Sequence, residues 1–445
     1  MSAYTLRIFD GSAVVGTLVW DRESDAFSLS YASKWVASKA AYPLSPHLPF
    51  SGQASTSTVR RFIENLLPEG RALDVASTHS NIQKNNVFGL IRLLGKETAG
   101  ALSFLPEGEL PGQMQPVLRD ITAAELQERI DACNEIPFSV WDGKVRMSVA
   151  GYQDKLLVLV DGERIGLADG ALSSTHILKP EAINRAMPYM VANEHYCMRL
   201  MSRITTRHFK RDMVAPVEIR RVPSPVLLVR RFDRVGDSTR TRRLHIIDGC
   251  QAVDLPVALK YERNMGSGTD VQHIRDGMSF EKLMSTRAWL QKPAEGLRHL
   301  VAWAVSTLLL GNSDAHGKNI SFFTGRAGLA VAPLYDLVSV AQYDGNMYEH
   351  DLAMAFGDIF SLKEIGAFAL ADFCVHTGIP RPYFARELSA LCAAALAEAR
   401  LQAGDPVYKG REVEFVNGTA SFVEERAKVL LSMAPDIAKF NKDNF

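Results

Sequence analysis

A polar cluster directly follows a long apolar run in residues 311–323, GNSDAHGKNISFF. The preceding run, VAWAVSTLLL, must be buried, and polar groups beside it are costly unless they are hydrogen-bonded, hold an ion or carry out chemistry. Asp314 and Asn319 stand five residues apart in this cluster. A carboxylate there could accept a proton from a hydroxyl group while the amide oxygen binds a divalent cation. The stretch is therefore the first candidate site.

The same spacing separates the catalytic Asp from the metal-binding Asn in the protein-kinase loop H-R-D-x-x-x-x-N. Downstream, SFFTGRAGLAVAPLYDLVSV predicts a hairpin followed by Asp336, which would supply a second acidic ligand. Oxygen ligands of this kind together with nucleotide phosphates suit Mg²⁺ better than Zn²⁺. His316 and Lys318 lie in the same loop and are further candidates for nucleotide contact. Taken alone, an Asx-rich loop after a helix more often reflects turn chemistry.

Two upstream residues match further parts of a kinase site. Lys179 ends the alternating apolar segment STHILKP, as does the phosphate-binding Lys of the kinase strand V-A-I-K. Glu194 follows fifteen residues later, near the start of the amphipathic segment EHYCMRLMSRI, where it could form the kinase Lys-Glu ion pair. The structural alternatives are a solubilising charge on an edge strand for Lys179 and a favourable first-turn acid for Glu194.

Two more segments could contact a nucleotide. The stretch RMSVAGYQDKLLVLVDG is neither a G-x-G-x-x-G loop nor a Walker sequence, so it could hold phosphates only through backbone amides and a lysine. Its candidate residues are Val149, Ala150, Gly151, Tyr152, Gln153, Asp154 and Lys155. The run PVLLVRRFDR predicts a strand ending at Arg230, Arg231 and Phe232, where a kinase would have its hinge; a core strand with solvated ends is the alternative.

The elements that must position these residues follow from apolar periodicity. Residues 4–30 predict two or three short strands, residues 58–104 are largely helical in pattern, and PEGELPGQMQP is typical of a linker. From 138 to 233 strand-like runs recur with one helix among them, and from about 270 nearly everything is helical in pattern. The sequence therefore predicts an α+β fold.

Composition limits the class of protein. The chain has 445 residues, which favours two or three sub-domains, and its 47% hydrophobic and 22% charged residues are typical of a globular protein. No signal peptide or apolar run of about eighteen residues is recognised, so we expect a soluble, cytoplasmic protein without a membrane contact. Its five scattered cysteines are expected to be buried thiols.

Charge is balanced overall but not locally. Fifty basic and fifty acidic residues cancel, whereas residues 199–243 contain thirteen Lys or Arg and four Asp or Glu. Such a stretch could touch DNA phosphates, attract an acidic substrate or form a solvated face.

Several motifs together resemble the HipA family of bacterial toxin kinases. They are SVAGYQDK, THILKP, NEHYCMRL, RRFDR, CQAVDLPVALKYE and SDAHGKNISFF, joined by the N-terminal FIENLLPEGR and LIRLLGKETAGALSFLPEG. The resemblance covers most of the chain and implies a two-lobed, protein-kinase-like α+β fold. Residues 1–105 would form an additional N-terminal sub-domain, 106–235 the N-lobe with phosphate loop and hinge, and 236–445 the helical C-lobe.

The resemblance also implies residue roles in an ATP- and Mg²⁺-dependent serine/threonine-protein kinase. Asp314 would be the catalytic base, Asn319 and Asp336 the metal ligands, and Lys179 the ATP phosphate contact. Ser148 would be an inhibitory autophosphorylation site, because a phosphate adds about −1.5 to −2 charges beside a loop that must hold ATP phosphates. The chain departs from the family pattern at Arg230, where members carry Glu, and within its phosphate loop at Tyr152 and Asp154.

The implied partners are a HipB-like helix-turn-helix antitoxin and, through the complex, operator DNA. The implied substrate is a protein hydroxyl, in particular on an aminoacyl-tRNA synthetase such as glutamyl-tRNA synthetase, whose inactivation would stop translation and growth. Two alternatives remain open at the level of sequence. One is a lipid or small-molecule kinase, since D-x-H-x-x-N also resembles the phosphoinositide-kinase loop, and the other is a mainly structural co-repressor of a DNA-binding antitoxin.

Overall fold

The computed structural model describes residues 3–112, 115–146, 154–182, 184, 186–237, 241–345 and 350–440. The chain forms two compact units, each assembled from segments far apart in sequence. Unit 1 contains residues 1–183, 220–257 and 321–332, and unit 2 contains residues 184–219, 258–320 and 333–445. The three sub-domains expected from the sequence stay a prediction, because these units follow tertiary contacts rather than chain order.

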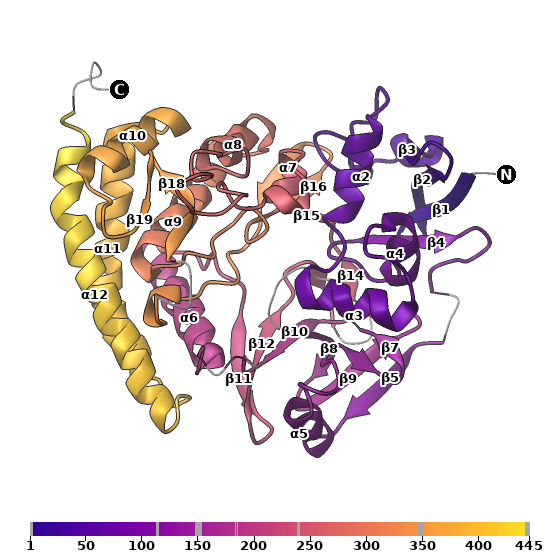
Figure 1. The fold of residues 1–445 in the computed structure, drawn as a ribbon, viewed down its shortest axis with the longest axis horizontal. Helices are drawn as coiled ribbons and strands as arrows, with labels where there is room; N and C mark the ends of the chain where they lie inside the picture. Colours follow the sequence, from indigo (N-terminus) through magenta and orange to yellow (C-terminus); the bar gives the residue numbers. More distant parts are fainter. Residues whose placement is uncertain are drawn as a thin grey trace. The chain divides into compact units, whose positions relative to one another are not determined.

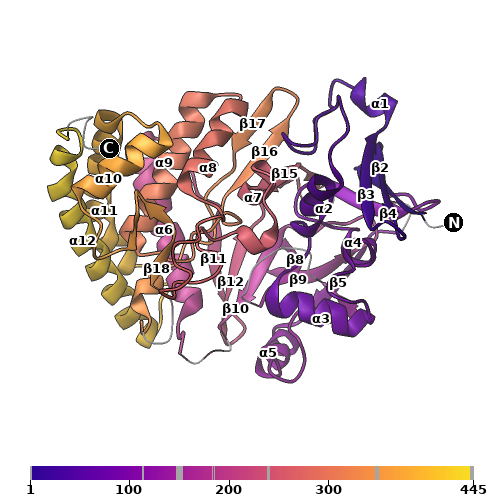
Figure 2. The ribbon, with the colours of Figure 1, turned by 45° about the horizontal axis from the view of Figure 1, so that its top comes forward.

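Unit 1 begins with a small sheet and its helices. The four strands lie in the order β3-β2-β1-β4, with antiparallel pairing throughout, and are visible at the N-terminal end of the chain (Figure 2). They span β1 (Ala3–Asp10), β2 (Ala13–Asp21), β3 (Ala26–Tyr31) and β4 (Leu102–Pro106). The helices are α1 (Ser33–Val36), α2 (Thr56–Glu64), α3 (Gly70–Ser80) and α4 (Val87–Leu94). The predicted strands and helices of this region are confirmed.

Five strands of a six-stranded sheet belong to unit 1, and the sixth, β11, has its residues 217–219 in unit 2 (Figure 1). The strand order of the sheet is β11-β12-β10-β8-β9-β5, so β10 is an interior strand. Alternation places Leu156, Leu178 and Leu228 in one buried cluster that also contains Leu126 and Trp141. The elements are β5 (Val117–Ile121), α5 (Ala123–Asp131), β6 (Val140–Trp141), β7 (Lys144–Val145), β8 (Leu156–Asp161), β9 (Arg164–Asp169), β10 (His176–Pro180), β11 (Val217–Arg221) and β12 (Pro225–Arg230).

Short strands complete unit 1. The predicted hairpin is confirmed as β16 (Ser321–Gly325) and β17 (Gly328–Val331), and β16 also pairs with β15 (Ile246–Asp248). Helix α7 (Gly249–Ala252) follows β15 directly and begins with a capping box between Asp248 and Gln251. The remaining pair is β13 (Arg234–Val235) and β14 (Arg242–Arg243).

Unit 2 is mainly helical, as the sequence predicts. The helices are α6 (Met190–Phe209), α8 (Phe280–Ser285), α9 (Pro293–Leu310), α10 (Ala367–Thr377), α11 (Arg381–Ala403) and α12 (Arg411–Ile437). The long α11 and α12 lie side by side (Figure 1). The sequence analysis did not predict a second hairpin among these helices, which is formed by β18 (Asp351–Phe356) and β19 (Ile359–Ser361). A short, fully apolar run such as LAMAF carries no period that distinguishes strand from helix.

The chain thus has a mixed α+β fold. Its cysteines are all free, and Cys197, Cys250, Cys374 and Cys392 are buried as expected, whereas Cys133 is half-buried. Among the described residues, no helix combines the length and the apolar character needed to span a membrane.

Candidate active site around Asp314

The candidate loop begins where helix α9 ends. Pro293 opens the helix, and the residues from Leu300 to Leu310 are all buried, which makes α9 a rigid support. Gly311 ends it with a left-handed φ of +62°. A Cβ atom at this position would lie within 2.7 Å of Ala341 and 2.9 Å of Phe422, so glycine is required both by backbone conformation and by space. The predicted helix end is confirmed.

Hydrogen bonds fix the backbone of the loop. The Asp314 amide donates to Asn312 Oδ1 at 3.1 Å, and the Asp314 carbonyl accepts from Asn319 Nδ2 at 2.8 Å. Tyr335 Oη donates to the Lys318 carbonyl at 2.7 Å. The side chains of Asn312 and Asn319 therefore stabilise the turns of the loop. These bonds also hold the polar residues of the loop in one geometry.

The Asp314 carboxylate differs from its neighbours in exposure. Its side chain is 47% exposed, whereas the His316 side chain is 6% exposed. Tyr261 Oη donates to Asp314 Oδ1 at 2.5 Å, and His316 Nε2 lies 4.0 Å from the same oxygen. The ring of Tyr261 packs edge-on against His316 with centroids 4.9 Å apart. The site thus presents one oriented carboxylate to solvent.

His316 is a neutral member of the site. Burial lowers its pKa well below the usual value, and the positive charges of Lys260 and Lys318 lower it further, against the opposing charge of Asp336. Its Nδ1 accepts a hydrogen bond from the Lys318 amide at 3.2 Å, so the proton of the neutral ring resides on Nε2. Hydrogen bonds and short distances join Asp314, His316, Lys318 and Asn319, and the charge of Asp336 also acts on His316, so these five residues form one cluster.

Two oxygen-bearing residues of this cluster fit a divalent cation. Asn319 uses its amide nitrogen in the bond to Asp314, which leaves its oxygen as the atom that can face a cation. Asp336 has a left-handed φ of +57°, a backbone conformation that Asp adopts more readily than most other non-glycine residues. In the described part of the chain, no group of three or more His, Cys, Asp or Glu residues could hold a metal. An Asn-Asp pair therefore requires further oxygen ligands, such as those of a nucleotide.

Lys179 and Glu194 are both buried. Lys179 lies on the interior strand β10 and is 5% exposed, so the alternative that it is a solubilising charge on an edge strand was wrong. Glu194 is 1% exposed and lies beyond the first turn of α6, which begins at Met190, so the first-turn reading was wrong as well. Buried charges are costly unless they are paired. Their mutual ion pair stays a prediction.

The predicted hinge and phosphate loop are described in part. Arg230 is exposed at the end of β12. Phe232 is half-buried and its ring meets Phe323 edge-on at 5.9 Å. The Arg231 side chain is buried in an ion pair with Asp233 at 2.8 Å, and the Arg231 amide donates to the Thr175 carbonyl at 3.0 Å, so that at this position nucleotide contact would have to come from the backbone carbonyl.

In the phosphate loop, Ser148 and the residues from Val149 to Gln153 lie outside the described residues. Asp154 pairs with Arg71 at 3.4 Å, and burial raises its pKa while Arg71 and Lys155 oppose the shift. Lys155 is 4% exposed immediately before β8.

Comparisons with known proteins decide the family. Residues 6–105 match the model of the HipA N-terminal domain, and residues 147–399 match that of the HipA-like C-terminal domain. The chain belongs to the HipA family. With that membership its enzyme class is that of the serine/threonine-protein kinases.

Relatives support this assignment along nearly the whole chain. The serine/threonine-protein kinase toxin HipA of Shewanella oneidensis is 40% identical over 379 residues, which cover 85% of this chain and 84% of that protein. The putative kinase Y4mE of Sinorhizobium fredii is 32% identical over 88% of this chain and 90% of its own length. A solved structure of Shewanella oneidensis HipA with HipB and operator DNA superposes with a TM-score of 0.87 at 36% identity, covering 98% of this chain and 100% of that one.

The sequence interpretation missed two residues of the site in this HipA-family chain. Tyr261 bonds to Asp314, and Lys260 lies beside it, with its ammonium 5.4 Å from the Tyr261 ring and its carbonyl accepting from the Gly317 amide at 3.0 Å. Both belong to the motif CQAVDLPVALKYE, which contributed to the resemblance but received no role. The signal was a tyrosine beside charged residues in a segment without helical or strand period, fifty-three positions from Asp314.

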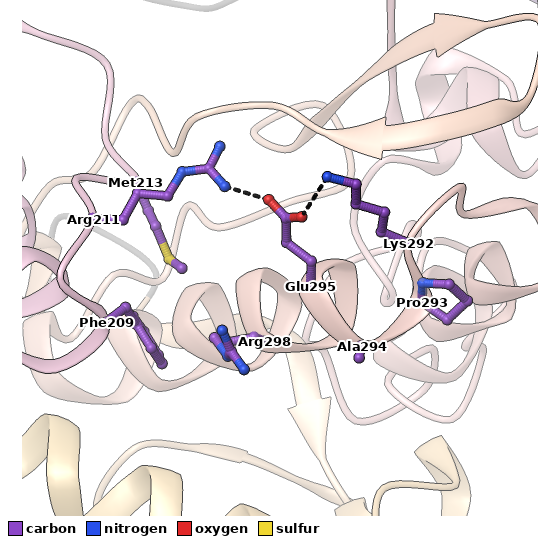
Figure 3. A pocket seen from close by; sticks show the side chains of 8 residues that line it. All are labelled: Phe209, Arg211, Met213, Lys292, Pro293, Ala294, Glu295 and Arg298. Atoms are coloured by element: carbon purple, nitrogen blue, oxygen red, sulfur yellow. Dashed lines mark hydrogen bonds and ion pairs between the residues drawn. The ribbon is translucent and has the colours of Figure 1, made fainter.

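A cavity of about 480 Å³ at the start of α9 contains none of the predicted site residues. Figure 3 shows Glu295 reaching toward both Arg211 and Lys292, and the Lys292 pair spans 3.4 Å. The lining residues are Phe209, Arg211, Met213, Lys292, Pro293, Ala294, Glu295 and Arg298. Since its only carboxylate is neutralised by two cations, this cavity offers no group for proton transfer.

The basic stretch 199–243 is divided by the fold. Arg203 and Arg207 both pair with Glu398, at 2.6 and 2.8 Å. Arg231 and Arg234, in the other unit, pair with Asp233 and are nearly inaccessible. The local excess of positive charge in the sequence is therefore largely neutralised at these positions and does not by itself define a binding surface.

Proposed function

We propose that this chain is a toxin kinase that binds ATP with Mg²⁺ and transfers the γ-phosphate to a serine or threonine hydroxyl of a protein. The observation that carries this proposal is the carboxylate of Asp314, 47% exposed at the end of a buried helix and oriented by Tyr261. The polar neighbours His316, Lys318 and Asn319 are all buried, so within residues 314–319 Asp314 is the polar side chain that a substrate can reach.

In this reaction the substrate oxygen forms a bond to the γ-phosphorus, and the bond between that phosphorus and the bridging oxygen of ADP breaks. The proton of the hydroxyl passes to the carboxylate of Asp314, which Tyr261 orients through a hydrogen bond to Oδ1. Because His316 is neutral, it adds no charge to the site and does not compete as an ion with Asp314 for the substrate hydroxyl. The protein would contribute to the reaction mainly by positioning the base Asp314 beside the bound γ-phosphate.

Asn319 and Asp336 would hold the metal ion, which when bound would neutralise charge on the β- and γ-phosphates. Lys179 and Lys155 would contact the phosphates, together with the loop 149–154 and with His316 and Lys318, and Glu194 would pair with Lys179. The backbone after β12, at Arg230 to Phe232, would contact adenine in a two-lobed, kinase-like arrangement.

The proposed partners follow from the family. Shewanella oneidensis HipA was solved in a complex with HipB and operator DNA, which supports a HipB-like antitoxin that neutralises this chain and represses the operon together with it. The proposed substrate is an aminoacyl-tRNA synthetase such as glutamyl-tRNA synthetase, whose phosphorylation would stop translation and growth. Phosphate on Ser148 would repel the nucleotide phosphates and inactivate the enzyme.

Intact mass spectrometry with peptide mapping tests the proposal. The protein is incubated with ATP and Mg²⁺ beside the Asp314→Asn variant and a matched control, Asp270→Asn, which changes an exposed aspartate of the same unit. We expect phosphate on Ser148 in the wild type and the control, and none in Asp314→Asn. Phosphate gained equally by all three proteins would refute Asp314 as the base.

Labelled ATP with cell lysate separates the remaining possibilities. Label in protein supports a protein kinase, and label in lipid supports a lipid kinase instead. Growth assays with the antitoxin distinguish the co-repressor alternative: loss of growth inhibition in Asp314→Asn with operator binding preserved supports the kinase, whereas inhibition that survives the substitution supports a structural role.

A further inference from the structure

A second cluster of charges lies in unit 1. We call it the Glu97 cluster; its members are Glu97, Arg231, Asp233, Arg234 and Arg243. The side chains of Arg231, Asp233 and Arg234 are 3%, 5% and 2% exposed. Charges buried to this degree must be paired, and here each one is.

Glu97 connects this cluster to the start of β10. Its Oε1 accepts from the Ser174 amide at 2.9 Å and from the Ser174 hydroxyl at 2.7 Å. The same hydroxyl accepts from Arg231 Nη1 at 2.9 Å. Ser174 is 1% exposed and lies two residues before β10, the strand that carries Lys179. The Glu97 carboxylate thus fixes the point from which this strand departs.

The cluster also holds the chain where it leaves β12, the neighbour of β10. Arg231 follows β12 directly, and its amide donates to the Thr175 carbonyl at 3.0 Å. Asp233 accepts from the Gly100 amide at 2.8 Å. Arg234 donates to the Gly100 carbonyl at 3.1 Å and to Glu97 Oε1 at 3.2 Å. Residues 97–100 therefore bond to both strands of the pair.

These bonds join two regions that the family models treat as separate domains. Glu97 and Gly100 lie within the N-terminal domain match at 6–105, whereas Ser174 and Arg231 lie within the C-terminal match at 147–399. The register of β10 and β12 aligns Lys179 with Leu227, so a shift at either strand end would move the lysine relative to the residues after Arg230.

We propose that Glu97 is a positioning residue for nucleotide binding, which fixes β10 and the segment after β12 so that Lys179 and the backbone at Arg231 and Phe232 face ATP in one geometry. This inference rests on the proposed function, since it takes these residues as the nucleotide contacts. It gives the N-terminal domain a role within the kinase itself. Removing the Glu97 charge would leave three arginines facing one carboxylate, so the segment would lose its fixed position.

The test compares Glu97→Gln with the wild type and with Glu107→Gln, the same change at an exposed glutamate of the same region. We expect the ATP KM of Glu97→Gln to rise about 5- to 20-fold, at the low end of coupling between distant sites, with kcat changed less than about twofold. Glu97→Asp is expected to recover part of the affinity. The Glu107 control should match the wild type.

An unchanged ATP KM in a folded Glu97→Gln protein overturns the positioning role, as does a loss of kcat at constant KM. Where Glu97→Gln fails to fold, Ser174→Ala removes the hydroxyl bond to Glu97 without changing charge, and a rise in the ATP KM at nearly constant kcat again supports the proposal.

Amide hydrogen exchange over residues 174–180 without nucleotide provides a readout independent of ATP: faster exchange in Glu97→Gln supports the ordering of β10, and unchanged exchange refutes it. A wild type that binds no ATP overturns the proposed function instead.

Discussion

The loop at Asp314 and the Glu97 cluster are both polar groups set against apolar elements, yet they differ in how completely their charges are neutralised. In the Glu97 cluster each carboxylate faces arginines, and Asp233 alone bonds to Arg231 and Arg234 at 2.8 and 2.7 Å. At the loop, the Asp314 carboxylate remains 47% exposed and bonds to the hydroxyl of Tyr261. Paired buried charge is suited to fixing structure, whereas an oriented and accessible carboxylate is suited to proton transfer. The predictions below test this distinction.

The largest effect is expected at Asp314. Replacing it by Asn should lower the rate of phosphoryl transfer about 10²- to 10⁴-fold, the usual contribution of a general base. The free energy of unfolding should change by less than about 1 kcal/mol, because the side chain is half-exposed. Transfer kinetics and urea denaturation of the same preparation give both numbers. If Asp314→Asn lowers the free energy of unfolding and leaves the transfer rate unchanged, Asp314 has a structural role like the charges of the Glu97 cluster.

Asp233 should show the opposite balance. Asp233→Asn leaves Arg231 and Arg234 without their buried counter-charge, so we expect unfolding to become about 3 to 5 kcal/mol easier. Urea denaturation measures the loss. Asp237→Asn, an exposed aspartate four residues away, serves as the control and should stay within about 0.5 kcal/mol. Equal effects of the two substitutions would contradict a structural role for the cluster.

The pH dependence of stability offers a third comparison. Burial by itself raises the pKa of Glu97, but Arg234, Arg231 and Arg243 outweigh it and hold the pKa at about 2. A carboxyl group whose pKa is depressed in the folded state stabilises the fold above its unfolded value of about 4.3 and loses that contribution as the pH falls toward the folded value.

The wild type should therefore be more stable than Glu97→Gln at pH 7 by about 2 to 3 kcal/mol. The difference should shrink between about pH 4.5 and pH 2, where the Glu97 carboxyl becomes protonated. Denaturation of both proteins at several pH values measures it, and the comparison cancels the effect of other carboxylates. A difference that does not vary with pH would mean that the Glu97 charge contributes nothing.

The smallest effect is expected at Tyr261. Tyr261→Phe keeps the ring against His316 but removes the hydroxyl that donates to Asp314. We expect kcat to fall about tenfold with little change in KM for ATP, because a hydrogen bond to a charged group is worth about 1.5 to 3 kcal/mol and the carboxylate itself remains. Steady-state kinetics check the split. Full activity in this variant would show that the carboxylate needs no such support.

Much of the fold could be predicted from local pattern. Short strand-like runs, one of them alternating, predicted β8, β10 and β12, and the apolar run of α9 together with Gly311 predicted both the helix and its end. The hairpin at 351–361 was missed because its apolar residues have no period that separates strand from helix. In the site, the spacing of Asp314 and Asn319 was sufficient to select the loop.

Other parts of the site could not be predicted. One interpretation of the sequence places Arg231 at the solvated end of a strand. Its side chain is nevertheless 3% exposed, because it forms ion pairs with Glu97 and Asp233. Tyr261 stands beside charged residues in a segment without a regular period, but that signal does not name its partner, which only the bond to Asp314 shows. Part of the basic excess of residues 199–243 is neutralised, because Glu398 pairs with Arg203 and Arg207.

The sequence by itself determined the elements and the order of the polar groups along them: the buried helix, the glycine that ends it, the loop from Asp314 to Asn319 and the strand that carries Lys179. Periodicity and helix-end preferences are local, and a single chain expresses them without reference to distant residues. The tertiary structure alone decided which charges are neutralised and which stay accessible. Pairing depends on segments as distant as Glu97 and Arg234 meeting in space, and no local pattern records that.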